Sequence, residues 1–182
     1  RFQIKGHIDG IVPCGTTGEA ATMDQDEYRL VVETVVKEAK GRVPIIAGAG
    51  SNDTHKAIHY SQIAKEAGAD ALLHVTPYYN KPTPAGLLAH FKAIAKASDL
   101  PIILYNVPGR TGSNVSAATT IKISKEVPQV VGVKEASGNI PQMMEIVKGV
   151  ASSFSVLSGD DAFTLSLMAV GGVGVISVAS NE

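Results

Sequence analysis

A lysine near the end of one apolar segment has the clearest chemical potential in this sequence. Lys134 follows Val130–Val133, a run typical of a parallel strand that is buried on both faces. Lysine is rarely buried without a partner, and burial disfavours its charged form, so the pKa of the amine falls. A neutral amine can attack a ketone and form a Schiff base, which serves as an electron sink. The alternative is a lysine paired with a carboxylate such as Glu135, and the segment by itself favours neither.

Three other segments carry polar residues that could act with this lysine. Tyr105 ends the run Ile102-Ile103-Leu104, where a phenol commonly packs but could also relay protons beside a Schiff base. Gly15-Thr16-Thr17-Gly18 joins a predicted strand to a predicted helix. Its amides and hydroxyls could hold a carboxylate, or it could be a tight turn with a capping threonine. Arg110, in a glycine-containing loop, could bind a carboxylate, although a lone loop arginine is usually solvated.

Two further clusters carry weaker signals. Ser158–Asp161 and Gly171–Gly174 lie where many parallel barrels bind phosphate, but their glycines could equally serve packing. Asp160 and Asp161 could be a metal pair, yet adjacent side chains point apart and no histidine supports them, so we expect no metal ion. Gly48-Ala49-Gly50 is too short for a dinucleotide fingerprint.

Composition restricts the class of protein. The chain has 182 residues, of which 45% are hydrophobic and 18% charged, so it can bury a sizeable core. The formal net charge of −1 argues against nucleic acid as a main partner. The single Cys14 excludes an internal disulfide framework, and apolar runs of about seven residues are too short to span a membrane. We therefore expect a cytoplasmic protein with no membrane or nucleic-acid partner.

Short apolar segments alternate with amphipathic ones along the chain. Seven segments are rich in β-branched residues and predict strands: Ile8–Pro13, Val43–Ala47, Ala71–Val75, Pro101–Val107, Val130–Val133, Phe154–Leu157 and Val173–Val178. The segments between them predict helices: Asp24–Lys40, Asp53–Ala67, Pro84–Ala97, Ala117–Glu126, Ile140–Val150 and Asp161–Ala169. The spacing of Thr22 and Gln25 predicts a capping box at the start of the first of these helices.

Repeated strand–helix units predict a parallel α/β sheet, and their near-equal spacing favours a (β/α)8 TIM barrel over a doubly wound sheet. About seven strands in 182 residues predict an incomplete barrel, a single domain over residues 1–182 without its first strand and its C-terminal helices. The chain has no initiator Met, and we expect it to be a piece of a longer protein. Because parallel strands share one rim at their C-terminal ends, the polar residues above are expected to converge there.

Five motifs, in order along essentially the whole chain, closely resemble the dihydrodipicolinate synthase family, which are pyruvate-dependent class I aldolase-type enzymes. The motifs are Gly15–Glu19, Pro77–Pro82, Tyr105–Gly112, Val133–Gly138 and Ser158–Asp161. The resemblance implies a Schiff-base lyase that condenses pyruvate with L-aspartate-4-semialdehyde to 4-hydroxy-tetrahydrodipicolinate, for diaminopimelate and lysine biosynthesis. It also implies that no metal or organic cofactor is needed, since Lys134 supplies the electron sink.

The resemblance assigns a role to each matching catalytic residue. Lys134 is similar to the lysine that forms the Schiff base with pyruvate, and Tyr105 to the phenol that relays protons. Thr16 resembles the hydroxyl that links Tyr105 to a second tyrosine, Tyr79, which the family inserts from a neighbouring subunit. The resemblance therefore implies a homo-oligomer, either a dimer or a tetramer.

It also assigns substrate-binding residues. Thr17 resembles the residue that holds the pyruvate carboxylate, and Arg110 the arginine that receives the carboxylate of the semialdehyde. Gly159 and Ile176 match positions whose backbone lines the pocket. N-acetylneuraminate lyase, which shares the pyruvate half-site, stays an alternative, as does a non-catalytic barrel that binds a phosphate ligand. Arg110 favours the synthase, because an arginine suits a short acidic aldehyde better than a long neutral polyol.

The family is often inhibited by lysine at a subunit interface, and two matching positions depart from the lysine-sensitive pattern. Lys56 stands where sensitive members carry an acidic residue, and Tyr28 where many carry a histidine. A cation at position 56 repels the ammonium of lysine. We therefore expect weak or absent inhibition by lysine.

Overall fold

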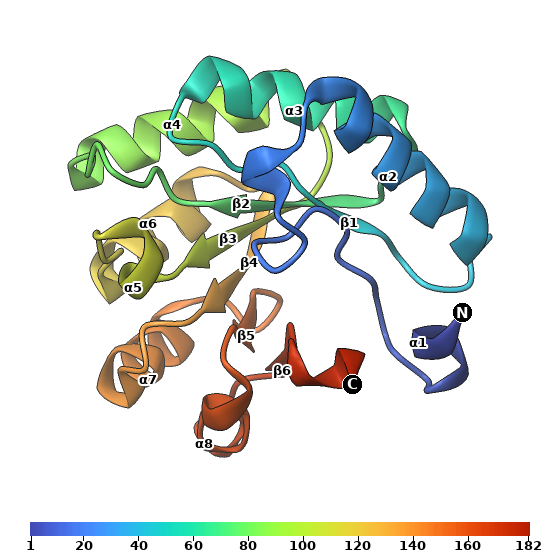
Figure 1. The fold of residues 1–182 in the computed structure, drawn as a ribbon. Helices are drawn as coiled ribbons and strands as arrows, with labels where there is room; N and C mark the ends of the chain where they lie inside the picture. Colours follow the sequence, from blue (N-terminus) through green and yellow to red (C-terminus); the bar gives the residue numbers. More distant parts are fainter.

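The computed structural model describes residues 1–182, and its centre is a curled sheet of six parallel strands (Figure 1). The strands follow one another in the sheet in the order of the sequence: β1 (Ile46–Gly48), β2 (Ala71–Val75), β3 (Ile102–Asn106), β4 (Val130–Glu135), β5 (Ser155–Ser158) and β6 (Gly174–Val175). Strand β6 does not pair with β1, so the sheet stays open. The fold is therefore an incomplete (β/α)8 barrel, which confirms the predicted class.

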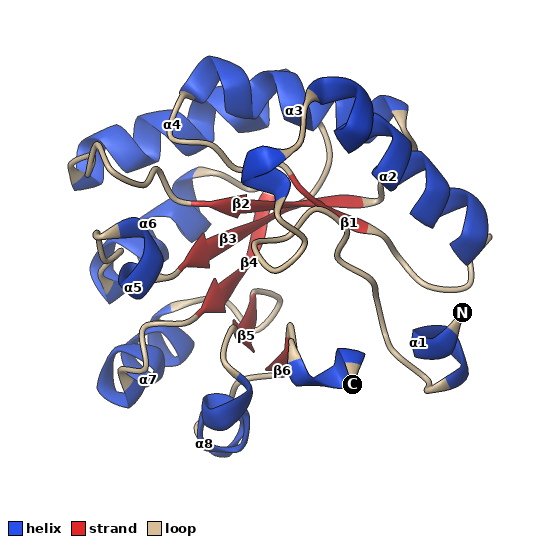
Figure 2. Ribbon diagram, in the orientation of Figure 1, coloured by secondary structure: helices blue, strands red, loops and turns tan.

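Helices cover the outer, convex side of this sheet (Figure 2). The longer ones are α2 (Gln25–Ala39), α3 (Thr54–Glu66), α4 (Pro84–Ala97), α6 (Ala117–Glu126), α7 (Ile140–Gly149) and α8 (Thr164–Ala169). Two single-turn helices, α1 (Phe2–Lys5) and α5 (Pro108–Thr111), and three 3-10 turns (Ala20–Thr22, Asp161–Phe163 and Ala179–Asn181) complete the set. None of these helices has the length and apolar character that crossing a bilayer requires.

The two edges of the sheet are less regular than the sequence predicts. The strand predicted over Ile8–Pro13 is wrong, because this segment forms only an isolated parallel bridge between Ile11 and Ile45. It has one hydrogen-bonding neighbour, and Pro13 and Pro44 supply no N–H to a ladder. At the other edge, β6 is shorter than the predicted Val173–Val178, since the N–H groups of Val178 and Ala179 bond to the carboxylate of Asp161 instead of to a strand.

The N-cap of helix α2 is Asp24, two residues later than the predicted cap Thr22. Asp24 accepts hydrogen bonds from the backbone N–H of Asp26 and Glu27, both at 2.9 Å, and Glu27 accepts one from the N–H of Asp24. The capping box predicted at Thr22 and Gln25 is therefore wrong. The Thr22 hydroxyl donates instead to the Glu19 carbonyl within the preceding 3-10 turn, which removes it as a cap.

Apolar side chains form two cores, one on each face of the sheet. A large cluster packs the helices against the outer face, and a small one, Leu73, Ile103, Tyr105 and Val107, lies apart from it with partly buried Leu157 and Ile176 against it. At one point the backbone itself fills the space. A Cβ on Gly48 would lie 2.0 Å from the carbonyl oxygen of Cys14, so only glycine lets the segment that leads into Thr16 pack against β1.

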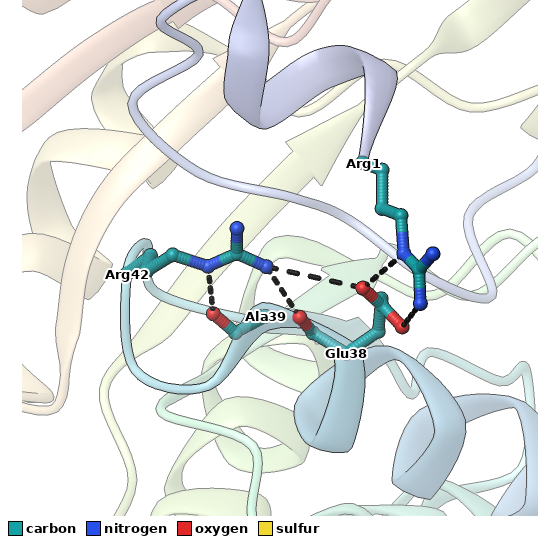
Figure 3. A network of polar contacts seen from close by, with 4 residues as sticks. All are labelled: Arg1, Glu38, Ala39 and Arg42. Carbon is teal, nitrogen blue, oxygen red and sulfur yellow. Dashed lines mark hydrogen bonds and ion pairs between the residues drawn. The ribbon is translucent and has the colours of Figure 1, made fainter.

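Polar contacts hold the short helix α1 in place. The guanidinium of Arg1 donates to the carboxylate of Glu38 near the end of α2, and Arg42 donates to the carbonyls of Glu38 and Ala39 (Figure 3). On the far end of the chain, Gln3 donates to the carbonyl of Ser180 at 2.9 Å. Helix α1 thus bridges the helical layer and the residues after β6, although exposed ion pairs of this kind each contribute only about 0–1 kcal/mol.

Two buried histidines between β2 and the helices are held neutral. Ser61 donates its hydroxyl hydrogen to the Ala57 carbonyl, so the Nε2 atom of His74, 3.1 Å away, must be the donor to Ser61. The other ring nitrogen of His74 has no partner, and neither has Nε2 of His90, whose Nδ1 bonds with Thr54. Burial, together with a smaller repulsion that a protonated His90 would exert, lowers the pKa of His74 to about 3. Burial also lowers the pKa of His90 to about 4, which Asp53 only partly opposes.

These histidines predict that the protein loses stability in mild acid. Their folded-state pKa values lie below the unfolded value of about 6.5, so the unfolded state takes up more protons as the pH falls. The free energy of unfolding is then unaffected by these histidines above about pH 6.5. It falls from there towards pH 4, by up to about 1.4 kcal/mol per pH unit for each histidine. Urea denaturation between pH 7 and pH 4.5 measures this slope. His90→Asn should reduce it, whereas His55→Asn on the exposed face of α3 should leave it unchanged.

Candidate active site

Lys134 lies near the C-terminal end of β4 and is buried without a counter-ion. Its side chain is 8% exposed and forms no ion pair or hydrogen bond. The Nζ atom lies 4.2 Å from the centre of the Tyr105 ring, and Tyr105 is the register partner of Lys134 on β3. Burial lowers the pKa of Lys134 to about 8, against the opposing charge of Asp161 and with a smaller contribution from the charge of Arg110. The amine is therefore far more readily neutral at physiological pH than an exposed lysine.

The alternative of a Lys134–Glu135 pair is ruled out by the geometry. Successive residues of a strand point to opposite faces, and Glu135 is fully buried on the side away from Lys134. Its carboxylate accepts hydrogen bonds from the side chain of Asn106 at 3.0 and 3.1 Å and from the N–H of Ser137 at 2.8 Å. Neither group therefore compensates the charge of the other.

Tyr105 and Thr16 come together from different segments. Tyr105 is 5% exposed, and burial raises the pKa of its phenol, while the neighbouring Thr16 hydroxyl and the Arg110 charge oppose this increase. The segment Gly15–Gly18 is a tight turn rather than a helix N-terminus, with the N–H of Gly18 bonded to the carbonyl of Gly15. Helix α2 begins only at Gln25, so the N–H donors of a helix are not available at this turn.

Gly159 follows β5 and leaves the space that the Lys134 side chain occupies. A Cβ at this position would lie 3.0 Å from both Cγ and Cε of Lys134 and 2.8 Å from the Cβ of Ala136. The N–H of Gly159 bonds to the carbonyl of Glu135, which fixes this close approach. Ile176 packs against the small inner cluster that contains Tyr105. Both predicted lining residues thus lie on the inner face beside the lysine and the tyrosine.

Asp161 is a residue whose part in this site the sequence did not reveal. The sequence suggests phosphate or metal binding for this residue, yet its carboxylate accepts hydrogen bonds from Ser177 and from the N–H groups of Val178 and Ala179. These bonds lower the pKa of Asp161, and the resulting negative charge acts on Lys134. Asp160 serves a separate purpose, since it caps the following 3-10 turn through the N–H of Ala162.

A cavity of about 310 Å³ opens beside this group. Its lining includes Thr16, Tyr105 and Arg110 at the end near the lysine, and Tyr28 and Lys56 among other residues. Lys134 is not part of the lining, but its ammonium lies over the ring of a tyrosine that is. No acidic side chain lines the cavity, and its charged residues are Lys56 and Arg110. The cavity therefore suits an anionic ligand.

Two predicted site residues lie apart from this cluster. Thr17 is exposed and does not line the cavity. Tyr79 is 88% exposed, with a φ of 71° that non-glycine residues rarely adopt, and it too is outside the lining, whereas its neighbour Tyr78 is part of it. The roles given to Thr17 and Tyr79 by resemblance therefore stay predictions.

Comparison with known proteins agrees with this geometry. The model of the "Dihydrodipicolinate synthetase family" matches residues 1–182. The chain belongs to this family. A 4-hydroxy-tetrahydrodipicolinate synthase of Maridesulfovibrio salexigens is 59% identical over 180 residues, which cover 99% of this chain and 62% of that protein. The chain thus spans about three fifths of the length of the curated relatives that it matches.

Solved members of the dihydrodipicolinate synthetase family share the fold. Dihydrodipicolinate synthase from Aquifex aeolicus superposes with a TM-score of 0.96 at 50% identity, over 99% of this chain and 61% of that one. The chloride-inhibited synthase from Acinetobacter baumannii, a complex with pyruvate, superposes with a TM-score of 0.96 at 46% identity, over 99% of this chain and 62% of that one. The relationship therefore holds along the whole described chain.

The electrostatics of the site predict how Lys134 titrates. Competitive labelling with trace acetic anhydride, followed by peptide mass mapping, should give a midpoint near pH 8 for this amine. Asp161→Asn removes the charge that raises the pKa, so the midpoint should fall, and Arg110→Gln should raise it. Lys65→Gln, on the far end of α3, is the matched control and should leave the midpoint unchanged. Equal midpoints in all four proteins would contradict this account.

Proposed function

We propose that this chain carries the pyruvate-binding half of a Schiff-base lyase that condenses pyruvate with L-aspartate-4-semialdehyde to 4-hydroxy-tetrahydrodipicolinate. The observation that carries the proposal is the uncompensated amine of Lys134 over the ring of Tyr105. With a pKa of about 8, roughly a tenth of this amine is neutral at pH 7, against less than about a thousandth for an ordinary lysine. The names of the relatives support the same reaction.

Lys134 would supply both the nucleophile and the electron sink. Its neutral amine attacks the keto carbon of pyruvate, and loss of water leaves an iminium linkage. The positive nitrogen then accepts electrons as a methyl proton of pyruvate departs, which forms an enamine. The enamine carbon attacks the aldehyde carbon of the second substrate, whose oxygen becomes the hydroxyl of the product and restores the iminium. The amino group of the semialdehyde then attacks the iminium carbon and displaces the amine of Lys134, which closes the ring of the product and frees the enzyme. No metal or organic cofactor takes part in this sequence.

Tyr105 and Thr16 would move the protons that these steps require. A buried phenol beside the reacting nitrogen can protonate the hydroxyl group of the first adduct, so that it departs as water, and can later accept or return a proton. Thr16 approaches Tyr105 and connects it to the cavity. Tyr79 would extend this relay from a neighbouring subunit, which its exposed side chain permits, and the active form is then a homo-oligomer, a dimer or a tetramer.

Arg110 would recognise the second substrate. Its guanidinium lines the cavity, where a fork of N–H donors suits the carboxylate of the semialdehyde. Thr17 is proposed to hold the carboxylate of pyruvate, and the backbone at Gly159 and Ile176 to line the pocket. The partners of the enzyme are then small molecules, and the cytoplasmic location expected from composition is the setting in which such substrates are made.

Pyruvate trapping tests this reaction directly. Borohydride reduction of the full-length protein with pyruvate should attach a stable adduct to the peptide that contains Lys134, and Lys134→Ala should abolish it. Lys125→Ala, on the exposed side of α6, is the control and should trap as the wild type does. A folded protein that traps no pyruvate would refute the proposed lyase reaction. Turnover of sialic acid in preference to the semialdehyde would show that the proposed second substrate is wrong.

Weak inhibition by lysine follows from the charge of the cavity. The ammonium of Lys56 lies 5.7 Å from the centre of the Tyr60 ring, and Tyr28 packs edge-on against the same ring at 4.7 Å. Both Lys56 and Tyr28 line the cavity, which has no carboxylate to attract the ammonium of a lysine ligand. We therefore propose that this protein escapes the lysine inhibition that is common in its family.

Inhibition assays check this expectation. The full-length enzyme should keep its activity at lysine concentrations of about a millimolar, and Lys56→Glu should lower the inhibitory concentration by about tenfold or more, because it replaces repulsion by attraction. Lys56→Gln, which removes the charge without reversing it, should fall between the two. Inhibition of the wild type by micromolar lysine would contradict the expectation.

A further inference from the structure

A buried carboxylate lies directly behind the two reactive side chains of the site. Tyr105 pairs in register with Lys134, and the next residues along the same strands, Asn106 and Glu135, pair with each other. The first pair is on the inner face of the sheet, so the second lies on the outer face. Asn106 and Glu135 are both fully buried, and no cation pairs with the carboxylate.

Only N–H donors stabilise this carboxylate. Asn106 donates to both of its oxygens, the backbone N–H of Ser137 donates to Oε1 at 2.8 Å, and the amide of Gln142 on α7 donates to Oε2 at 3.3 Å. A buried charge held by neutral donors is costly compared with apolar packing of the same volume. Its presence at this register therefore calls for an explanation beyond stability.

The same network reaches the loop that carries Arg110. The side chain of Asn106 accepts from the N–H of Val115 at 3.0 Å and donates to Asn114 at 2.9 Å. Asn114 in turn donates to Gln142 at 2.8 Å. Residues 107–115 thus leave β3 at Asn106 and return to it. The bonded group of Asn106, Glu135 and Gln142, called the hub below, therefore fixes both ends of this loop.

We propose that Glu135, with Asn106, is a positioning residue that sets the Lys134 amine against Tyr105 and holds the Arg110 loop at the site. This inference rests on the proposed function for its kinetic effects. Glu135 touches neither the cavity nor the reacting atoms, and it acts through the strand pair and the loop. Loosening the hub lets β3 and β4 shift against each other, which separates the amine from the phenol and hydrates Lys134.

Moving the negative charge from position 135 to position 106 tests the hub while the volumes of both side chains stay nearly the same. Glu135→Gln brings an amide against three N–H donors, whereas the double variant Asn106→Asp/Glu135→Gln restores one carboxylate facing one amide. In the full-length protein, Glu135→Gln should reduce kcat by about tenfold or more, with KM for pyruvate changed less than about threefold. The double variant should recover most of kcat. Ile63→Ala, a core truncation on α3 chosen to lower the melting temperature comparably, should keep kcat near the wild-type value.

Asn114→Ala covers the case in which Glu135→Gln does not fold. It cuts only the loop side of the hub at an exposed position, and it should raise KM for the semialdehyde by about fivefold or more with little change in melting temperature. If kcat of Glu135→Gln equals that of Ile63→Ala, or the double variant recovers nothing, the positioning role is refuted. An unchanged KM in Asn114→Ala refutes its loop component.

Labelling of Lys134 separates this inference from the proposed function. The titration midpoint of the amine needs no substrate, and Glu135→Gln should move it upward by at least about half a pH unit as water reaches the lysine, with recovery in the double variant. If the wild type traps no pyruvate, the proposed function fails, and the midpoint by itself decides the positioning role. An unmoved midpoint in a folded Glu135→Gln protein contradicts it.

Discussion

The site depends on an ammonium group that is buried without a counter-ion. Lys134 loses most of its hydration at the inner face of β4, and no carboxylate bonds to it in return. The surrounding structure has to accommodate this cost. Gly159 has no side chain, which leaves space for the aliphatic part of Lys134. Tyr105 presents the face of its ring to the ammonium group, and Asp161 supplies a distant negative charge. These features together keep the amine close to the point at which it loses its proton.

The sheet makes this arrangement possible because different side chains are buried on its two faces. The inner face holds Tyr105, Lys134 and a small apolar cluster, and the outer face holds the large core under the helices. Polar groups are buried on both faces, but they differ in how they are satisfied. On the outer face, Glu135 and Asn106 are held by several hydrogen bonds, and His74 and His90 each leave one ring nitrogen without a partner but stay neutral. On the inner face, the ammonium of Lys134 is buried without a counter-ion. Reactivity is confined to the face where a charged group is left unsatisfied.

Much of the architecture could be predicted from local patterns. Continuous apolar runs identified the inner strands β2 to β5, and helical periodicity placed α4 and α6 at the bounds that the structure shows. The edges were predicted less well. Whether Ile8–Pro13 forms a strand depends on the neighbours available on each side, and the length of β6 depends on Asp161, which captures N–H groups 17 and 18 residues further along the chain. Such competition between distant groups leaves no local trace in the sequence.

The identity and order of the reactive groups can be predicted from the sequence, because Lys134 and Tyr105 stand at the ends of apolar strand segments and Thr16 and Arg110 lie within recognisable motifs. The environment of each group is set by the folded chain. It separated Lys134 from Glu135, turned the Thr16 segment into a tight turn, and linked Glu135 to a loop through residues far apart in sequence. Desolvation and hydrogen-bond satisfaction depend on all the atoms within a few ångströms of a group. The chain specifies these neighbours only once it has folded.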